Sequence, residues 1–354
     1  MTSSRYRLLG SVGSPYALKL RALLRYRRVP FDWVPTSLDW VPEGLPHPPL
    51  SDRSRREIAN MKPAVVPAVW FPQDGSFRND STVIAYELEK QSGERSIIPP
   101  DPVWAFLSHL LEDMADEWGV KIAFNYRWGY AEYSHYKSRI VVGELLGGGY
   151  DEVVQLEAAK HFAQRQIGRM QLVGCALPNR EAIEATFHRI LDVVNRLPTT
   201  SNFIFGDVAS LADFGWYGQL LSLATDPTPT RIIQTHAPGV FQYLQLLEDA
   251  SGIDACWPES GTKPPAPVLE LLKIAGEVYL PFLHANANAY VQGEDSFSLS
   301  IYGNPYSQKP FRYQVKCLGW LREEYDALVG VARTRADAIL SGADCLSWLQ
   351  KPVH

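Results

Sequence analysis

The spacing of apolar and polar positions predicts a mixed α/β segment at the start of the chain. An apolar run over 6–11 predicts a strand, and leucines at helical spacing predict a helix over 15–28. Residues 31–34 predict a second strand. The proline-rich stretch 36–50 predicts an irregular excursion, with a short helix expected over 54–60.

The pattern that follows predicts a hairpin and one more helix. Residues 65–71 are strongly apolar and predict a third strand, although Pro67 lies inside it. Because proline cannot donate to a sheet ladder, we expect Pro67 at an edge, a bulge or a turn. Gly75 marks the hairpin turn, and a helix is expected over 80–91, capped by its first Asp or Ser.

Helical spacing then dominates up to about residue 257. A proline-rich linker over 96–102 separates this part from the α/β segment, and a second linker lies at 260–267. Ser210 and Asp213 have the spacing of a capping box ahead of an apolar helix that reaches Leu223. We therefore predict an all-α unit between the two linkers.

The last ninety residues predict helices and one hairpin. A helix is expected over 268–283. Apolar residues alternate with serines over 297–301 and alternate again over 311–315, so we expect two strands joined by a turn at 303–305. A final helix is expected from about Gly319.

Composition narrows the class of protein. The chain has 354 residues, 46% of them hydrophobic and 21% charged, which is the balance of a globular protein and excludes collagen-like or coiled-coil chains. Four cysteines without a CxxC pair exclude a disulfide framework and two-cysteine redox motifs, and they favour a reducing cytoplasm. We expect no secretory signal and no transmembrane span.

Charge is distributed unevenly along a chain whose formal net charge is −5. One interpretation of the basic start is a solvated helix face, and the other is a local field that attracts a small anion. We expect no nucleic-acid binding, because that requires a broader basic surface. Residues 1–30 carry seven basic side chains and no acidic one: Arg5, Arg7, Lys19, Arg21, Arg25, Arg27 and Arg28.

These features together resemble a known family. A Val-Pro pair in a strand, followed by a helix that starts with Asp-Ser, resembles the thioredoxin-like N-terminal domain of the glutathione S-transferases. The helical unit resembles the C-terminal domain of that family. The resemblance covers about residues 5–257, and the Pro-rich stretch 36–50 is longer than the compact classes of the family lead us to expect.

The resemblance implies a catalytic role for Ser14. Its position before Pro15 matches the serine-type branch, most closely the tau and zeta classes, in which the hydroxyl donates to the glutathione sulfur and favours the thiolate. The alternative interpretation is that Ser14 only caps its helix. Ser11, Tyr6 and Tyr16 are weaker candidates for the same role.

The resemblance also implies a binding site for glutathione as co-substrate. In the family, the proline at the position of Pro67 is cis, and the backbone at Val66 pairs with the cysteinyl part of glutathione. Ser81 corresponds to the residue that takes the γ-glutamyl carboxylate, and Asp80 to the residue that takes its amine, at a helix N-terminus. Plain helix capping and an edge-strand proline are the alternatives.

Two further groups of residues were candidates for chemistry. The first is an acidic helix face, for which we predict no metal because no second His/Glu motif accompanies it. The second is an aromatic stretch, in which Tyr126, Arg127 and Trp128 are candidates for the wall of a hydrophobic co-substrate pocket, with core packing as the alternative. The acidic face comprises His109, Glu112, Asp113, Asp116 and Glu117.

We therefore predict a thioredoxin-like glutathione-binding domain at 1–95, an all-α domain at 102–260 and an extension at 265–354, with an α and β-hairpin content, that packs on the helical domain. The implied protein is a cytoplasmic, homodimeric glutathione transferase acting on a small hydrophobic electrophile, as in detoxification. A non-catalytic scaffold for ligands or proteins is the alternative. A thiol–disulfide oxidoreductase is less favoured because it needs a cysteine at position 14.

Overall fold

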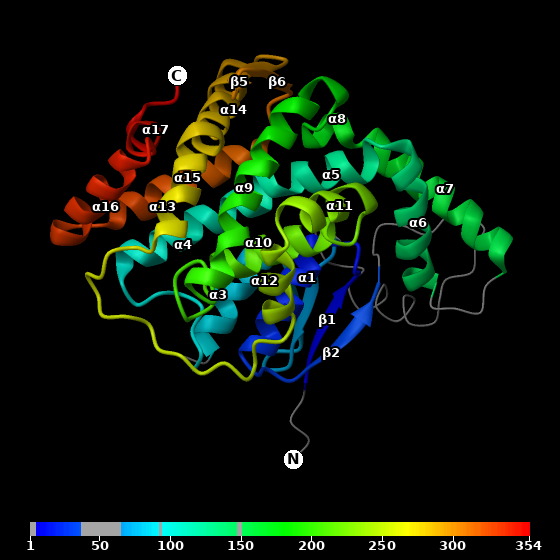
Figure 1. Cartoon of the computed structure of the whole chain (residues 1–354), viewed down its shortest axis with the longest axis horizontal. Coiled ribbons are helices and arrows are strands. Elements are labelled where there is room, and N and C mark those ends of the chain that lie inside the picture. The colour runs from blue at the N-terminus through cyan, green and yellow to red at the C-terminus, as the bar shows by residue number, and fades with distance from the viewer. Residues whose placement is uncertain (1–4, 37–64, 92–93, 147–150) are drawn as a thin grey trace.

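The computed structural model describes residues 5–36, 65–91, 94–146 and 151–354. The expected excursion at 36–50 lies outside these residues except for its first position, and so does the expected helix at 54–60. Figure 1 shows a small sheet below a thick layer of helices. The first segment comprises β1 (Tyr6–Gly10), α1 (Pro15–Tyr26), β2 (Phe31–Pro35), β3 (Ala68–Phe71), β4 (Ser76–Asn79) and α3 (Ser81–Gln91).

The sheet has the strand order β2-β1-β3-β4. Strands β1 and β2 run parallel, with Leu8 opposite Trp33, whereas β1–β3 and β3–β4 are antiparallel, with Leu8 opposite Val69. Helix α1 is the crossover between the two parallel strands, as a parallel pair requires. This arrangement confirms the predicted thioredoxin-like α/β domain.

Short local signals set the ends of these elements. Ser14 is the N-cap of α1 and Pro15 occupies its first turn. The Val66–Pro67 peptide bond is cis, as the resemblance implies, and it stands just before β3. The strand therefore starts one residue after Pro67, which avoids placing a residue without an N–H inside the ladder.

The second segment is helical, which confirms the predicted fold class. The expected capping box is present at the start of α10, where Ser210 and Asp213 satisfy each other's backbone N–H groups. The helices are α4 (Pro102–Met114), α5 (Val120–Trp128), α6 (Ala131–Leu146), α7 (Glu152–Gly168), α8 (Met170–Val173), α9 (Arg180–Thr200), α10 (Leu211–Leu223), α11 (Pro227–His236) and α12 (Gly239–Glu248), with a π-helical turn at Ala115–Gly119 between α4 and α5 and a 3₁₀ turn at Leu177–Asn179.

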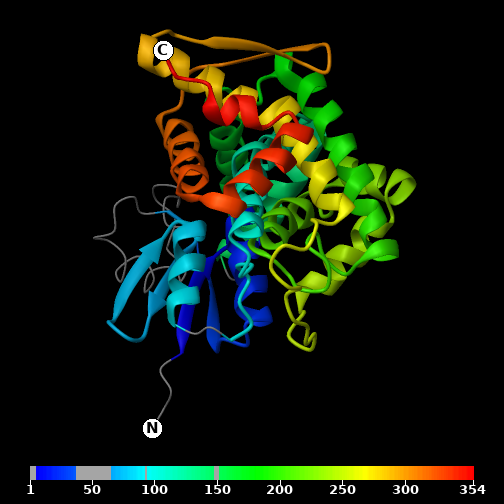
Figure 2. The ribbon, with the colours of Figure 1, turned by 90° about the vertical axis from the view of Figure 1, so that its left-hand side faces the viewer.

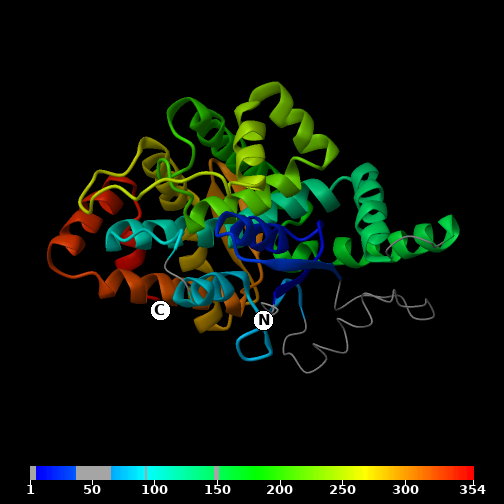
Figure 3. The ribbon, with the colours of Figure 1, turned by 90° about the horizontal axis from the view of Figure 1, so that it is seen from below.

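The third segment packs along the helical layer. Helix α13 contacts α4 and α9, and helices α15 and α16 contact α4, so one buried apolar cluster runs through all three segments. Figures 1 and 3 show α15–α17 and α6–α7 at opposite ends of the layer. The segment comprises α13 (Ala266–Ile274), a π-helical turn (Ala275–Tyr279), α14 (Leu280–Gln292), β5 (Phe297–Ile301), β6 (Asn304–Gln308), α15 (Arg312–Ala327), α16 (Gly330–Gly342) and α17 (Leu346–Gln350).

The hairpin differs from the prediction in its second strand. That strand is β6 at Asn304–Gln308, and the expected strand at 311–315 is instead the start of α15. Tyr302 and Gly303 both have positive φ, 50° and 81°, so a two-residue turn closes the hairpin earlier than expected. The alternation of apolar residues over 311–315 was a weak signal, because helical spacing continues it to Leu318 and Leu321.

A glycine permits a close contact between the first two segments. A Cβ atom at Gly218 of α10 would lie 2.3 Å from the carbonyl oxygen of Pro15. We expect Gly218→Ala to lower the free energy of unfolding by about 1–3 kcal/mol through overpacking. Gly319→Ala in α15, where a Cβ meets nothing within 4 Å, should instead raise it by about 0.5–1 kcal/mol. Denaturant titration measures the free energy of unfolding of both variants. Equal changes in the two variants would contradict this expectation.

Candidate functional site

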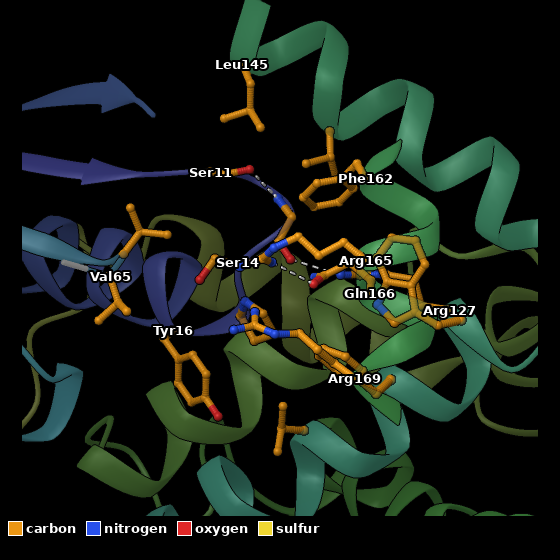
Figure 4. Close-up of a pocket in the computed structure, with 17 residues that line it drawn as sticks. Ser11, Ser14, Tyr16, Val65, Arg127, Leu145, Phe162, Arg165, Gln166 and Arg169 are labelled. Atoms are coloured by element: carbon orange, nitrogen blue, oxygen red, sulfur yellow. Dashed lines mark hydrogen bonds between the residues drawn. The ribbon is translucent and has the colours of Figure 1, made fainter. Parts of the chain in front are cut away.

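A cavity of about 240 Å³ lies where the first segment meets the helical one. Figure 4 shows the β1–α1 loop and Val65 on one wall and side chains from α5, α6 and α7 on the other. The first segment lines it with Ser11, Gly13, Ser14, Pro15, Tyr16, Val65 and Val66, and the helical segment lines it with Val120, Phe124, Arg127, Trp128, Val141, Leu145, Phe162, Arg165, Gln166 and Arg169.

Ser14 lies at this cavity with a hydroxyl hydrogen to donate. Its oxygen accepts a long hydrogen bond of 3.4 Å from Ala17 N, as an N-cap does. In the described part of the chain, no acceptor lies within hydrogen-bond distance of that hydroxyl. The oxygen points into the cavity on the side of Val65 (Figure 4). A free donor at a helix N-terminus is suited to stabilise an anion there.

The weaker candidates are engaged elsewhere. Ser11 donates to the Glu144 carboxylate at 2.8 Å, and Tyr16 donates to the Asp116 carbonyl at 2.9 Å. Tyr6 donates to Gln91 at 2.6 Å and does not line the cavity. Burial is the main cause that raises the pKa of Tyr16 well above its usual range, so this phenol keeps its proton. Of the four hydroxyls, Ser14 alone has no acceptor for its hydrogen among the residues that the structure describes.

Two side chains of the helical segment hold the β1–α1 loop in place. One oxygen of Glu144 accepts from Ser11 Oγ and from Val12 N, both at 2.8 Å. The guanidinium of Arg127 donates to the Gly13 carbonyl at 2.9 Å and is itself paired with Asp226 at 2.8 Å. No sequence signal marked Glu144, which lies more than 130 positions from the loop.

The predicted binding residues do not all line this cavity. Val66 does, and Pro67 is buried behind it. Asp80 lies at the start of α3, where its Oδ1 accepts from Thr82 N at 3.1 Å and Val83 N at 3.4 Å. Ser81 is 5% exposed and lines neither this cavity nor the second one described below. The structure thus brings Ser14 and Val66 together at the first cavity. Asp80 and Ser81 lie at the start of α3 and do not line that cavity.

Ser81 belongs to a buried ionic cluster centred on Lys19. The Lys19 ammonium is fully buried and donates to Ser81 Oγ at 3.2 Å and to Asp116 at 2.7 Å. It also pairs with Glu112. The interpretation of the basic start as a solvated face is therefore wrong for Lys19. Leucines flank Lys19 on both sides, and that apolar setting was the signal available in the sequence.

Opposed effects set the ionisation of this cluster. Burial alone would lower the pKa of Lys19, but the charges of Asp116 and Glu112 outweigh it and raise the pKa. Burial raises the pKa of Asp116 to about 7, although Lys19 opposes the rise. Ion pairing thus keeps a cation in an interior that otherwise disfavours charge.

The three candidates for the co-substrate wall have different positions. Arg127 and Trp128 line the cavity, and Arg127 is 4% exposed with its guanidinium engaged as described. Tyr126 does not line it and stacks on Tyr130 at 6.0 Å between ring centroids. The apolar part of the wall comes mainly from Phe124, Trp128 and Phe162.

The acidic face of α4 is buried rather than exposed. His109 bonds to Glu324 of α15 at 2.7 Å, and Asp113 accepts from Tyr279 at 2.6 Å. Burial alone would lower the pKa of His109, but the Glu324 carboxylate outweighs it and raises the pKa to about 9. Across the described ranges, no group of three or more His, Cys, Asp or Glu is arranged to hold a metal ion.

A second cavity, of about 290 Å³, lies between α3, α4 and α15. Asp80 and Thr82 contribute to it from the start of α3, and Tyr313 and Trp320 from α15. Carboxylates outnumber cationic groups among its described lining residues, with Lys90 and His109 as the cations. The carboxylates are Asp80, Glu87, Asp113, Glu323 and Glu324.

Comparison with protein families identifies the first segment. Residues 13–91 match the family described as "Glutathione S-transferase, N-terminal domain". The chain therefore carries a glutathione S-transferase N-terminal domain, which confirms the resemblance for this segment. A comparison with curated proteins gave no match. No helix of the described residues combines the length and apolar character needed to cross a membrane.

Solved structures of glutathione S-transferases are similar to this chain at low identity. One from Rhodospirillum rubrum F11 is 18% identical, with a TM-score of 0.42 over 75% of this chain and 99% of the other. One from Methylobacterium radiotolerans, in complex with glutathione sulfonate, is 17% identical, with a TM-score of 0.41 over 73% and 100%. The tau-class enzyme from mango is 17% identical, with a TM-score of 0.40 over 72% and 94%.

Removing the buried cation tests the ionic cluster. Lys19→Met leaves Glu112 and Asp116 without their partner, so we expect a loss of about 3–5 kcal/mol in the free energy of unfolding at pH 8. Because the folded-state pKa of Asp116 lies above its unfolded value of 3.8, the folded state binds more protons between about pH 4 and 7. Protonation of Asp116 neutralises a carboxylate that has lost its partner, so the loss in the free energy of unfolding should be smaller at pH 5.

The matched control is Lys160→Met on α7, where the lysine side chain is 56% exposed and pairs with Glu157. It should change stability by less than about 1 kcal/mol at either pH. Urea titration of both variants at pH 5 and pH 8 measures the difference. If Lys19→Met lowers the free energy of unfolding equally at the two pH values, the loss does not come from the unpaired carboxylates of this cluster.

Proposed function

We propose that the protein is a glutathione transferase in which Ser14 activates the glutathione thiol. The observation that carries the proposal is the hydroxyl hydrogen of Ser14, which meets no acceptor in the described part of the chain and lies at a helix N-terminus beside a cavity. A hydroxyl that donates to sulfur stabilises the thiolate relative to the thiol, and the thiolate is the nucleophile. The family match over residues 13–91 supports glutathione as the co-substrate.

Val66 and the start of α3 are the proposed binding groups for glutathione. The backbone at Val66, ahead of the cis Pro67, would pair with the cysteinyl unit near Ser14. Asp80 and Ser81 would take the γ-glutamyl amine and carboxylate. The distinct positions of these two pairs fit an extended tripeptide that reaches from the first cavity towards α3.

The electrophile would bind against the helical wall of the first cavity. Phe124, Trp128 and Phe162 offer aromatic surface to a hydrophobic co-substrate. Arg127 would act on the loop that carries Ser14 rather than on the electrophile, because its guanidinium bonds to Gly13 and Asp226.

Several further proposals complete the description. We propose a homodimer located in the cytoplasm, with a role in detoxification. We also propose the division at 1–95, 102–260 and 265–354, with the extension packed on the helical domain. Contacts of α13, α15 and α16 with α4 support the last point.

A non-catalytic scaffold is the second candidate, and one observation favours it. The Ser81 hydroxyl accepts from Lys19 and donates to Asp116 at 3.3 Å, so it is already engaged within the protein. If the Ser81 hydroxyl serves only to bond within the protein, the site would bind glutathione weakly. Ser81→Ala therefore tests the binding site: weaker glutathione binding in calorimetry assigns Ser81 to that site, and unchanged binding assigns this hydroxyl a structural role only.

Replacing Ser14 separates catalysis from capping. Ser14→Ala and Ser14→Gly both remove the hydroxyl, but glycine is nearly as good an N-cap while alanine costs about 1 kcal/mol. We expect both variants to lose roughly tenfold to a hundredfold in turnover while glutathione affinity changes less than about twofold. Steady-state kinetics on a panel of electrophiles, calorimetry and thermal melting measure the three effects.

The outcomes discriminate between the candidates. If turnover falls in the alanine variant only, in parallel with its stability, Ser14 acts as a helix cap. Unchanged turnover in both variants would move the catalytic role to Ser11, Tyr6 or Tyr16. Glutathione binding without turnover by the wild-type protein across the panel supports the scaffold.

A further inference from the structure

The third segment reaches the start of α3. Tyr313, in the first turn of α15, donates its hydroxyl to Asp80 Oδ2 at 3.0 Å. The next residue, Gln314, donates to Glu117 Oε2 at 3.0 Å. Figure 2 shows α15 directly above α3 and the sheet. A residue of the third segment thus bonds to a carboxylate of the first segment.

Asp80 is held from two sides in a left-handed conformation. Its φ is 73°, in the left-handed region that residues other than glycine seldom adopt. Its Oδ1 caps α3 through Thr82 N and Val83 N, which leaves Oδ2 for Tyr313. A strained residue fixed from several sides is a feature of binding sites.

The Asp80 carboxylate retains capacity for one more donor. A carboxylate offers about four acceptor positions. Two are used by the amides of α3 and one by Tyr313, so one stays for a ligand. That ligand would meet the second cavity, whose excess of carboxylates and whose aromatic residues Tyr313 and Trp320 suit a positively charged nitrogen.

We infer that α15 completes the amine end of the glutathione site, with Tyr313 as the residue that positions Asp80. The inference rests on the proposed function. Tyr313 fixes the rotamer of the carboxylate so that its remaining acceptor position faces the γ-glutamyl ammonium. The extension then has a role in binding as well as in packing.

The test is Tyr313→Phe, which keeps the ring and its edge contact with Trp320 at 6.0 Å. Calorimetry would use two ligands: reduced glutathione and an analogue in which hydrogen replaces the γ-glutamyl amino group. We expect the variant to bind glutathione about tenfold more weakly and the analogue within about twofold of wild type. A purely structural effect would weaken both ligands equally.

Tyr325→Phe is the matched control in the same helix. Its hydroxyl donates to Asp337 at 2.7 Å, and it lines neither cavity. It should bind both ligands as the wild type does. If Tyr313→Phe matches this control, or loses both ligands alike, the inference is overturned while the proposed function stands. If the wild type binds neither ligand, both fail.

Discussion

The buried Lys19 ammonium is the interaction on which the junction between the first two segments depends. It lies on α1, bonds to the start of α3 through Ser81 and pairs with Glu112 of α4 and Asp116 of the π-helical turn. Each of these charges would be costly in the interior without the others. The cluster therefore holds α1, α3 and α4 together at this junction.

Much of the first segment follows from local signals that the sequence displays. Ser14 with Pro15 and the capping box at Ser210 each act within a few residues, so α1 and α10 start where we expected. The third strand, expected over 65–71, instead starts at Ala68, after the cis Val66–Pro67 bond. The prediction of the second hairpin strand was wrong because the local signal there was ambiguous. Alternation over 311–315 suits a strand as well as the first turn of a helix, and only the packing of α15 decides between them.

The long-range contacts could not be predicted from local signals in the sequence. Glu144 meets Ser11 and Val12 across 133 and 132 positions, and nothing near Glu144 in the sequence marks it as a partner of that loop. The acidic face of α4 was visible as a pattern, but its burial was not. Its partners, Lys19 and Glu324, come from the first and last segments, so only the assembled fold shows that the face is internal.

The contact between Asp80 and Tyr313 has a consequence for how the protein is made. The two residues are separated by 233 positions in the chain. Domains generally fold from the N-terminus onwards during synthesis, so the sheet and α3 form while most of the chain is still to be translated. The Asp80 carboxylate therefore meets the Tyr313 hydroxyl only after α15 has left the ribosome.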